Sequence, residues 1–236
     1  MKNILIQVFI IAFISLNSKA QKTSYEFKVG LREEFVKSNV SSGNIENVSH
    51  ARPTIGMDII VNTKGSTVWP FGLFIQNYAG RTLIERSDIG STLNSNWFLG
   101  LSGGMERFFL RNKKINLSMT LNQIIIFVPN SKMQIASNSF PDGVNPERAI
   151  KTETVRAFRT LNPVSQIGGK VWLPLRKNKA GIYLGYSYNL GWNPLFEREV
   201  NYNIENISST AKTGYAKFVT NGTGWQTNFG LRMNMP

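Results

Sequence analysis

The chain has no cysteine, a single histidine and few acidic residues. Its 236 residues include 27 lysines and arginines against 14 aspartates and glutamates, which gives a formal net charge of +13. The absence of cysteine excludes disulfides, thiolate metal sites and a lipid anchor on cysteine. With His50 alone, no Cys/His cluster can form to bind a metal. Beyond residue 20 there is no long uninterrupted apolar run, so we predict no transmembrane helix in the rest of the chain.

Residues 1–20 have the pattern of an export signal peptide. Lys2 supplies the positive start, and the mostly apolar stretch 4–16 is too short to span a bilayer as a helix. Small side chains at Ser18 and Ala20 predict cleavage after Ala20, which leaves residues 21–236 as one β-domain. The basic charge of this domain suggests an anionic neighbour, and export favours membrane phosphate over nucleic acid.

Apolar and polar residues alternate along much of the chain, which is typical of β-strands with one apolar face. Near the end of the chain, for example, Trp225 and Phe229 alternate with Gln226 and Asn228. The same pattern predicts eight strands, at residues 24–37, 55–61, 69–76, 97–106, 115–122, 166–175, 182–192 and 225–235.

The connections between these strands alternate in length. The short ones are polar, as tight turns are, and lie at residues 62–66, 111–114 and 176–181. The others are predicted to be long loops, at about residues 38–52, 78–96, 129–162 and 193–214. Short turns at one end and long loops at the other are typical of outer-membrane barrels, whose short turns face the periplasm.

The polar face of the strands is rich in small residues such as Gly100, Ser102 and Gly104. Glycine weakens an open strand and needs a packing reason, which the narrow interior of a barrel of about eight strands supplies. The bulky apolar face would then contact lipid. We therefore predict an all-β, eight-stranded, antiparallel up-and-down transmembrane β-barrel. Aromatic residues near the strand ends would lie at the two membrane–water interfaces: Tyr25, Trp69, Trp97, Trp192 and Trp225.

With this signal, size and strand pattern, residues 21–236 resemble the small bacterial outer-membrane β-barrels of the OmpA and OmpX type. Gln21 after the cleavage site adds a similarity to the PorT-like barrels of Bacteroidota. The resemblance implies a porin-like protein of the Gram-negative outer membrane without a cofactor. Its partners would be lipopolysaccharide and phospholipid, the barrel-insertion machinery, and an envelope or secretion-system protein. Such barrels usually end in an aromatic residue, whereas this chain ends in Asn234-Met235-Pro236, so the insertion signal is atypical or lies at Phe229.

The polar face also carries charged residues, which would be costly to bury unpaired in a narrow lumen. They are Glu26, Lys28, Arg32, Asp58, Glu106, Lys170 and Arg232. Our hypothesis is that Asp58 and Glu106 pair with Lys28, Lys170 and Arg232 to form a polar plug that leaves no continuous pore. A gate or a proton path is the alternative use of the same residues.

We predict a non-enzymatic barrel with structural or binding roles, and we assign no catalytic, cofactor-binding or metal-binding residue. Two alternatives remain open at this point. A soluble, secreted lipocalin-like barrel would use the same alternation with its apolar face inward. An outer-membrane lipid-modifying enzyme would need His50 as its base, although Ser49 and His50 match no nucleophile motif.

Overall fold

A computed structural model describes residues 22–43, 45–48, 51–63, 65–84, 94–112, 114–129, 132–139, 147–175, 180–206 and 212–234. The predicted signal peptide and His50 lie outside these residues. The described chain forms 12 β-strands. It contains no helix that is long and apolar enough to cross a membrane.

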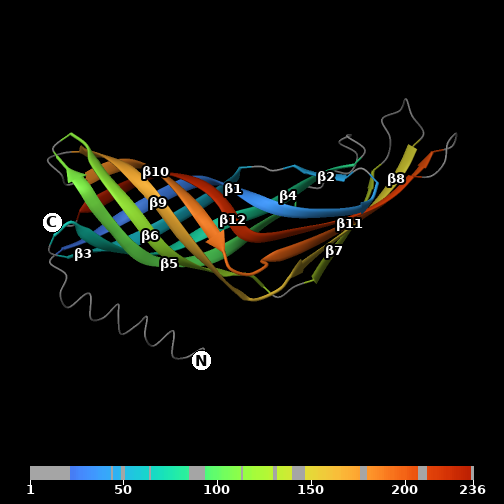
Figure 1. The fold of residues 1–236 in the computed structure, drawn as a ribbon, viewed down its shortest axis with the longest axis horizontal. Coiled ribbons are helices and arrows are strands. Elements are labelled where there is room, and N and C mark those ends of the chain that lie inside the picture. Colours follow the sequence, from blue (N-terminus) through green and yellow to red (C-terminus); the bar gives the residue numbers. More distant parts are fainter. Residues whose placement is uncertain are drawn as a thin grey trace.

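Eight of the strands form a closed antiparallel barrel, as the sequence predicted (Figure 1). In order around the barrel they are β1 (Lys22–Ser42), β3 (Arg52–Asn62), β4 (Thr67–Ile84), β5 (Asn94–Arg111), β6 (Asn116–Phe127), β9 (Leu161–Leu175), β10 (Ala180–Gly191) and β12 (Lys212–Asn234). The pairing of β1 with β12 closes the barrel. Closure pairs the backbone hydrogen-bonding groups of the wall and leaves no sheet edge there.

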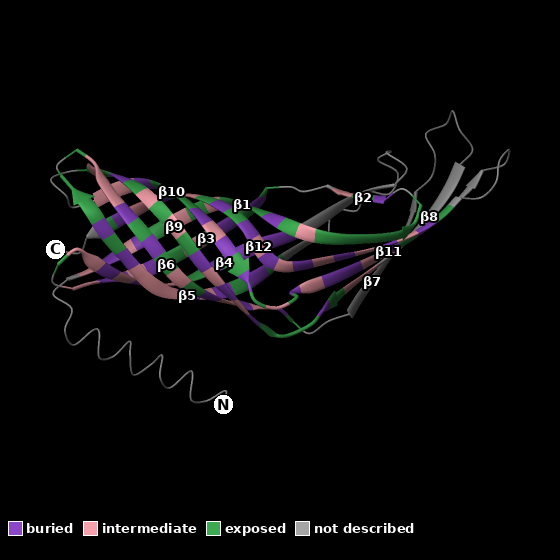
Figure 2. Ribbon diagram, in the orientation of Figure 1, coloured by how far each residue is buried: buried purple, intermediate pink, exposed green. Residues whose placement is uncertain are grey.

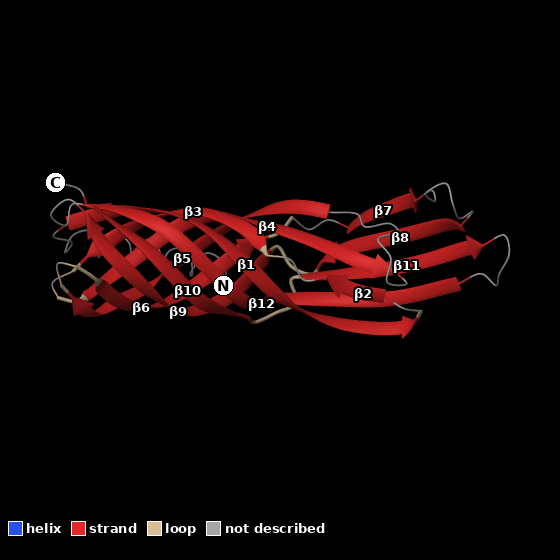
Figure 3. Cartoon of the chain, turned by 90° about the horizontal axis from the view of Figure 1, so that it is seen from above, coloured by secondary structure: helices blue, strands red, loops and turns tan. Residues whose placement is uncertain are grey.

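The prediction that the long connections are loops is wrong, because they contain β2 (Ile45–Val48), β7 (Lys132–Ser139), β8 (Glu147–Ala157) and β11 (Phe196–Asn206). The distal part of β1 continues into a sheet with β12, β11, β8 and β7, while β2 pairs with the end of β4. We call these strands and strand ends the extension. It projects from the barrel at the end opposite the short turns (Figure 3). β8 and β11 have 11 residues each, as many as β3 of the barrel, but their sequences are largely polar and carry fewer of the large apolar residues on whose alternation the strand prediction depends.

Strand β12 belongs to both parts of the molecule. Asn189 of β10 pairs with Gly224, whereas β11 begins its pairing with β12 at Thr220. Between these positions β12 bulges, and Gly222 adopts a left-handed conformation with φ of 81°. Glycine tolerates this conformation because it has no Cβ. The bulge is therefore the point at which β12 leaves the barrel wall and enters the extension.

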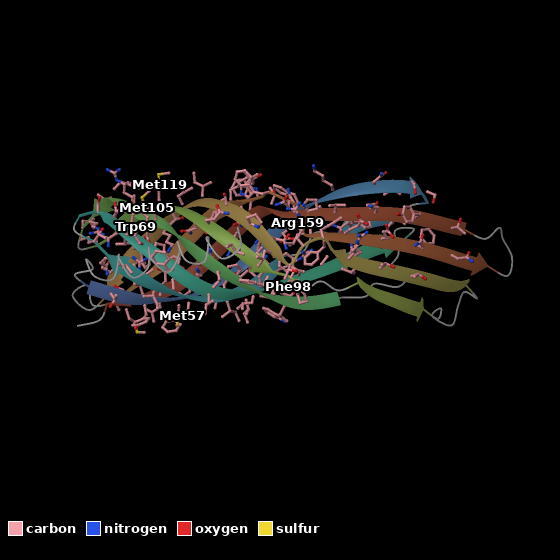
Figure 4. The ribbon with its side chains drawn as sticks, turned by 90° about the horizontal axis from the view of Figure 1, so that it is seen from below. Met57, Trp69, Phe98, Met105, Met119 and Arg159 are labelled. Carbon is pink, nitrogen blue, oxygen red and sulfur yellow. The ribbon has the colours of Figure 1, made fainter. Side chains whose placement is uncertain are left out.

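Buried and exposed residues alternate regularly over the barrel wall (Figure 2). On β10, Leu184 is 58% exposed, whereas Asn189 is 0% exposed and faces the lumen. The methionines Met57 and Met119 project from the outer surface of the barrel (Figure 4). The structure is thus the reverse of the lipocalin-like alternative, in which the large apolar side chains would line the interior.

Candidate functional site in the barrel lumen

Glycines on the inner face of the wall make room for larger side chains from neighbouring strands. A Cβ at Gly100 would collide with the ring of Phe74, and one at Gly230 with the ring of Tyr183. A Cβ at Gly72 would collide with the carboxylate of Asp58. The lumen is therefore filled by side chains that cross it, as expected for a barrel of this size.

The end of the lumen near the short turns holds four charged residues that we call the lower ion cluster: Glu26, Glu106, Lys170 and Arg232. Lys170 Nζ lies 2.8 Å from Glu26 Oε1 and 3.5 Å from Glu106 Oε2. Arg232 Nη2 lies 2.6 Å from Glu26 Oε2 and 2.5 Å from Glu106 Oε2. Both carboxylates are fully buried. Two carboxylates and two cations make the cluster neutral, which offsets part of the cost of burying its charges.

Aromatic side chains that the sequence analysis did not assign to the site surround this cluster. The Trp172 indole donates a hydrogen bond to Glu106 Oε1 at 2.9 Å, and the Arg232 guanidinium lies 4.2 Å from the Trp172 ring. Lys170 Nζ lies 4.5 Å from the ring centre of Tyr183. Both rings are buried on the face that otherwise carries small or polar residues. Both residues occupy inward-facing positions of the alternation, which is the sequence signal for a place in the lumen. Large aromatic rings are not what that pattern leads one to expect on the polar face.

A second pair and a layer of amides lie further along the lumen. Lys28 Nζ lies 2.7 Å from Asp58 Oδ2. Beyond this pair, Gln166 donates to Asn189 at 2.9 Å and to Gln226 at 3.2 Å. These hydrogen bonds link β9, β10 and β12 inside the lumen.

Arg32 lies apart from the other predicted charges, in what we call the upper ion cluster: Arg32, Glu34, Arg52 and Gln76. Arg32 Nε lies 3.3 Å from Glu34 Oε1, and Arg52 Nη1 lies 3.1 Å from Glu34 Oε2. Arg32 Nη1 donates to Gln76 Oε1 at 2.8 Å, and Arg32 Nη2 donates to the carbonyl of Gly222. Arg52 lies at the end of the predicted loop 38–52, and Glu34 is not among the charges predicted for the lumen. Because it donates to the carbonyl of Gly222, Arg32 connects the upper ion cluster to the bulge in β12.

A cluster of apolar side chains fills the lumen next to the upper ion cluster. In this apolar cap the rings of Tyr78, Phe98 and Phe196 form a triangle with centroid separations of 5.1 Å. Leu195, directly before β11, and Phe196, its first residue, pack against the inner faces of the barrel strands. The other members of the cap are Phe74, Ile124, Ile126, Val128, Ala157 and Val164.

The aromatic residues predicted for the membrane interfaces lie towards the two ends of the barrel wall. Tyr25 pairs with Met233 and Trp69 with Val61, both near the short turns. Trp97, Trp192 and Trp225 lie towards the extension and are exposed. The Tyr186 ring stacks on Trp225 with a centroid separation of 5.1 Å.

The lumen opens at the short-turn end into a cavity of about 480 Å³, which we call the vestibule. Its floor includes Arg232, Trp172 and Phe108, and Arg111 lies at its rim. Two cavities of about 30 Å³ lie deeper, each about large enough for one water molecule. The ion pairs and hydrogen bonds of the described lumen residues can hold the strands together, and the filled lumen can oppose the passage of ions.

No protein-family model matches the chain, and no curated protein matches its sequence. Among solved structures, the chain is similar to the outer membrane protein OprG from Pseudomonas aeruginosa, with 8% identity, a TM-score of 0.46, and coverage of 92% of this chain and 97% of that chain. It is similar to a major outer membrane protein from Thermus thermophilus, with 8% identity, a TM-score of 0.41, and coverage of 90% and 99%. Because these similarities are low, we infer function from the side chains of this chain.

Proposed function

We propose that the protein is a non-enzymatic β-barrel of the Gram-negative outer membrane whose lumen is sealed. The observation that carries this proposal is the reversal of burial across the wall: large apolar side chains face outward and paired charges face inward. An exposed belt of this kind is unfavourable in water and favourable against acyl chains. On β10 the outward-facing residues extend from Ile182 to Leu190, and Trp192 follows the strand directly, which is about the 9–11 residues that a tilted transmembrane strand needs.

In this proposal the short turns face the periplasm and the extension faces outward. The predicted interfacial aromatics would anchor the barrel at both surfaces of the bilayer, among phospholipids and lipopolysaccharide. Insertion by the barrel-assembly machinery follows from the same location. The extension offers the outer surface for a binding role, and the similarity to PorT-like barrels makes an envelope or secretion-system protein a candidate partner. Co-purification of neighbouring envelope proteins with the full chain, but not with a chain lacking β7 and β8, would support that partner.

Membrane location is tested by fractionation and gel mobility. The protein should pellet with the outer membrane, and its mobility in detergent should change on boiling, because a closed barrel resists unfolding at room temperature. Recovery in the aqueous periplasmic fraction would contradict the proposal.

The sealed lumen is tested separately, in planar lipid bilayers. Ion pairs and buried apolar side chains fill the described lumen from the lower ion cluster to the apolar cap, so we expect no large and stable ion currents. Sustained single-channel currents from the purified full chain would contradict the sealed lumen and favour the gate or proton path.

A further inference from the structure

The polar side of the vestibule is formed by two arginines and three asparagines. Its charged lining residues are Arg111 and Arg232, and no carboxylate is among the described residues that line it. The full described lining is Asn62, Phe108, Arg111, Asn112, Asn116, Trp172, Pro174, Ala180, Gly181 and Arg232. The cavity therefore has a positive polar wall and an apolar wall.

The two arginines differ in how far their charge is neutralised. Arg232 is bound by Glu26 and Glu106 in the lower ion cluster. Arg111 instead rests on the Phe108 ring, with its guanidinium carbon 4.2 Å from the ring centre, and donates to the carbonyl of Gly65 at 3.2 Å. Among the residues that the structure describes, Arg111 forms no ion pair. Its positive charge at the mouth of the vestibule therefore has no carboxylate in direct contact among these residues.

The asparagines beside Arg111 present donors because their oxygens are already engaged. Asn112 Oδ1 accepts hydrogen bonds from the backbone N–H of Lys114 at 2.8 Å and of Ile115 at 2.6 Å. Asn116 Oδ1 accepts from the backbone N–H of Asn112 at 3.0 Å. The remaining polar group of each side chain is its NH₂, which can only donate. The turn between β5 and β6 therefore fixes two amide donors next to a guanidinium.

We propose that the vestibule binds the oxyanion group of a small solute, a carboxylate or a phosphate, through Arg111, Asn112 and Asn116. Guanidinium and N–H donors match the acceptor oxygens of such a group. Trp172, Phe108 and Pro174 would contact the organic part of the solute, and a volume of about 480 Å³ is within the range of ligand pockets. Access from the periplasm rests on the proposed orientation, whereas the site itself does not.

Binding can be measured by NMR on the full chain in nanodiscs of zwitterionic lipid. Phenyl phosphate and benzoate are titrated while the indole N–H signal of Trp172, assigned with Trp172→Phe, is followed. We expect a saturable shift with at least one of the two anions and none with benzyl alcohol at the same concentration. The anion that binds more tightly identifies the oxyanion. No shift with either anion, or an equal shift with benzyl alcohol, would overturn the proposal.

Two variants test the donors, and a third serves as a matched control. Arg111→Gln should weaken binding about tenfold or more, because it removes a charge-assisted hydrogen bond. Asn112→Asp keeps the oxygens that accept from the turn but replaces the NH₂ donor with a negative charge, so it should abolish binding. Arg107→Gln, on the same strand but exposed on the outer wall, should bind like the unmodified protein. Unchanged binding in both vestibule variants, or equal weakening by Arg107→Gln, would contradict the site.

A further titration identifies the source of the anion. If nanodiscs containing phosphatidylglycerol compete with phenyl phosphate, the site takes a lipid headgroup; if they do not, it takes a soluble oxyanion. Either result retains the donor site. None of these measurements depends on membrane location in the cell, so failure of the vestibule and failure of the proposed function are distinguishable.

Discussion

Strand β12 passes through two environments, and its apolar face changes sides between them. In the barrel, Trp225 and Phe229 are exposed on the outer wall while Gln226 is buried in the lumen. In the extension, Ala216 and Phe218 are buried in an apolar cluster with Ile45, Val200 and Tyr202. There Lys217 is on the opposite face and pairs with Glu197 at 2.7 Å. The change occurs at the bulge around Gly222.

The proposed membrane location explains this difference, because the medium around a strand decides which of its faces is apolar. A strand whose outer neighbours are acyl chains places its large apolar residues outward and its hydrogen-bonding residues inward. A sheet surrounded by water buries the same residue types in its own interior. The barrel and the extension should therefore respond in opposite ways to equivalent substitutions.

The largest effect is expected when an ion pair in the barrel is broken. Glu26→Ala would leave Lys170 and Arg232 with one carboxylate between them, and we expect the free energy of unfolding to fall by about 3–5 kcal/mol. Lys217→Met, which removes a more exposed pair in the extension, should change it little. Equilibrium urea unfolding in lipid vesicles measures both. Equal effects would contradict the distinction between the two parts.

Charge placed on the outer wall should have the next largest effect. Phe229→Arg puts a guanidinium against acyl chains and should cost about 2–4 kcal/mol if it lies near the bilayer midplane. Val40→Arg, at an exposed position of β1 in the extension, should be close to neutral. The same unfolding assay compares the two variants. If Phe229→Arg leaves the free energy of unfolding unchanged, this face of the barrel is in water.

The bulge that joins the two parts is tested by Gly222→Ala. At φ of 81° a Cβ is strained, so we expect a loss of about 1–2 kcal/mol. Gly169→Ala is the matched control, because a Cβ there would meet no atom closer than 3.5 Å. If both substitutions have the same effect, the conformation of Gly222 is not what positions β12.

The smallest effect is expected from alkaline pH on the extension. The hydrogen bond to Glu197 raises the pKa of Lys217 above its usual 10.5. The pair therefore contributes fully below pH 10.5, and its contribution is lost as the pH rises through the higher pKa of the folded state. The ¹⁹F NMR signal of 4-fluorophenylalanine at Phe218 should report a slight loosening above this pH, which Lys217→Met should reduce. A response identical in the variant would exclude this pair as the cause.

The sequence predicted the barrel well because alternation survives wherever one face is apolar and the other is not. Residues 97–106, for example, lie within β5 and place Glu106 and Phe98 in the lumen as their positions require. The extension is not predicted, since Val200 and Tyr202 of β11 lie within the predicted loop 193–214. The contact of Arg232 with Glu106 crosses the lumen, and that of Arg232 with Glu26 joins the two strands that close the barrel, so both depend on closure and on the stagger of the strands. Alternation alone specifies neither the closure of the barrel nor the stagger of its strands.

Methyl NMR in nanodiscs that contain doxyl-labelled lipid tests most directly whether the apolar face of the barrel is in the bilayer. The methyl signals of Val29, Leu121 and Leu184, each more than half exposed on the outer wall, should broaden strongly. Those of Ile60, Ile126 and Val164, each 0% exposed inside the barrel, should remain comparatively sharp. Strong broadening of the second set with little effect on the first would contradict the account.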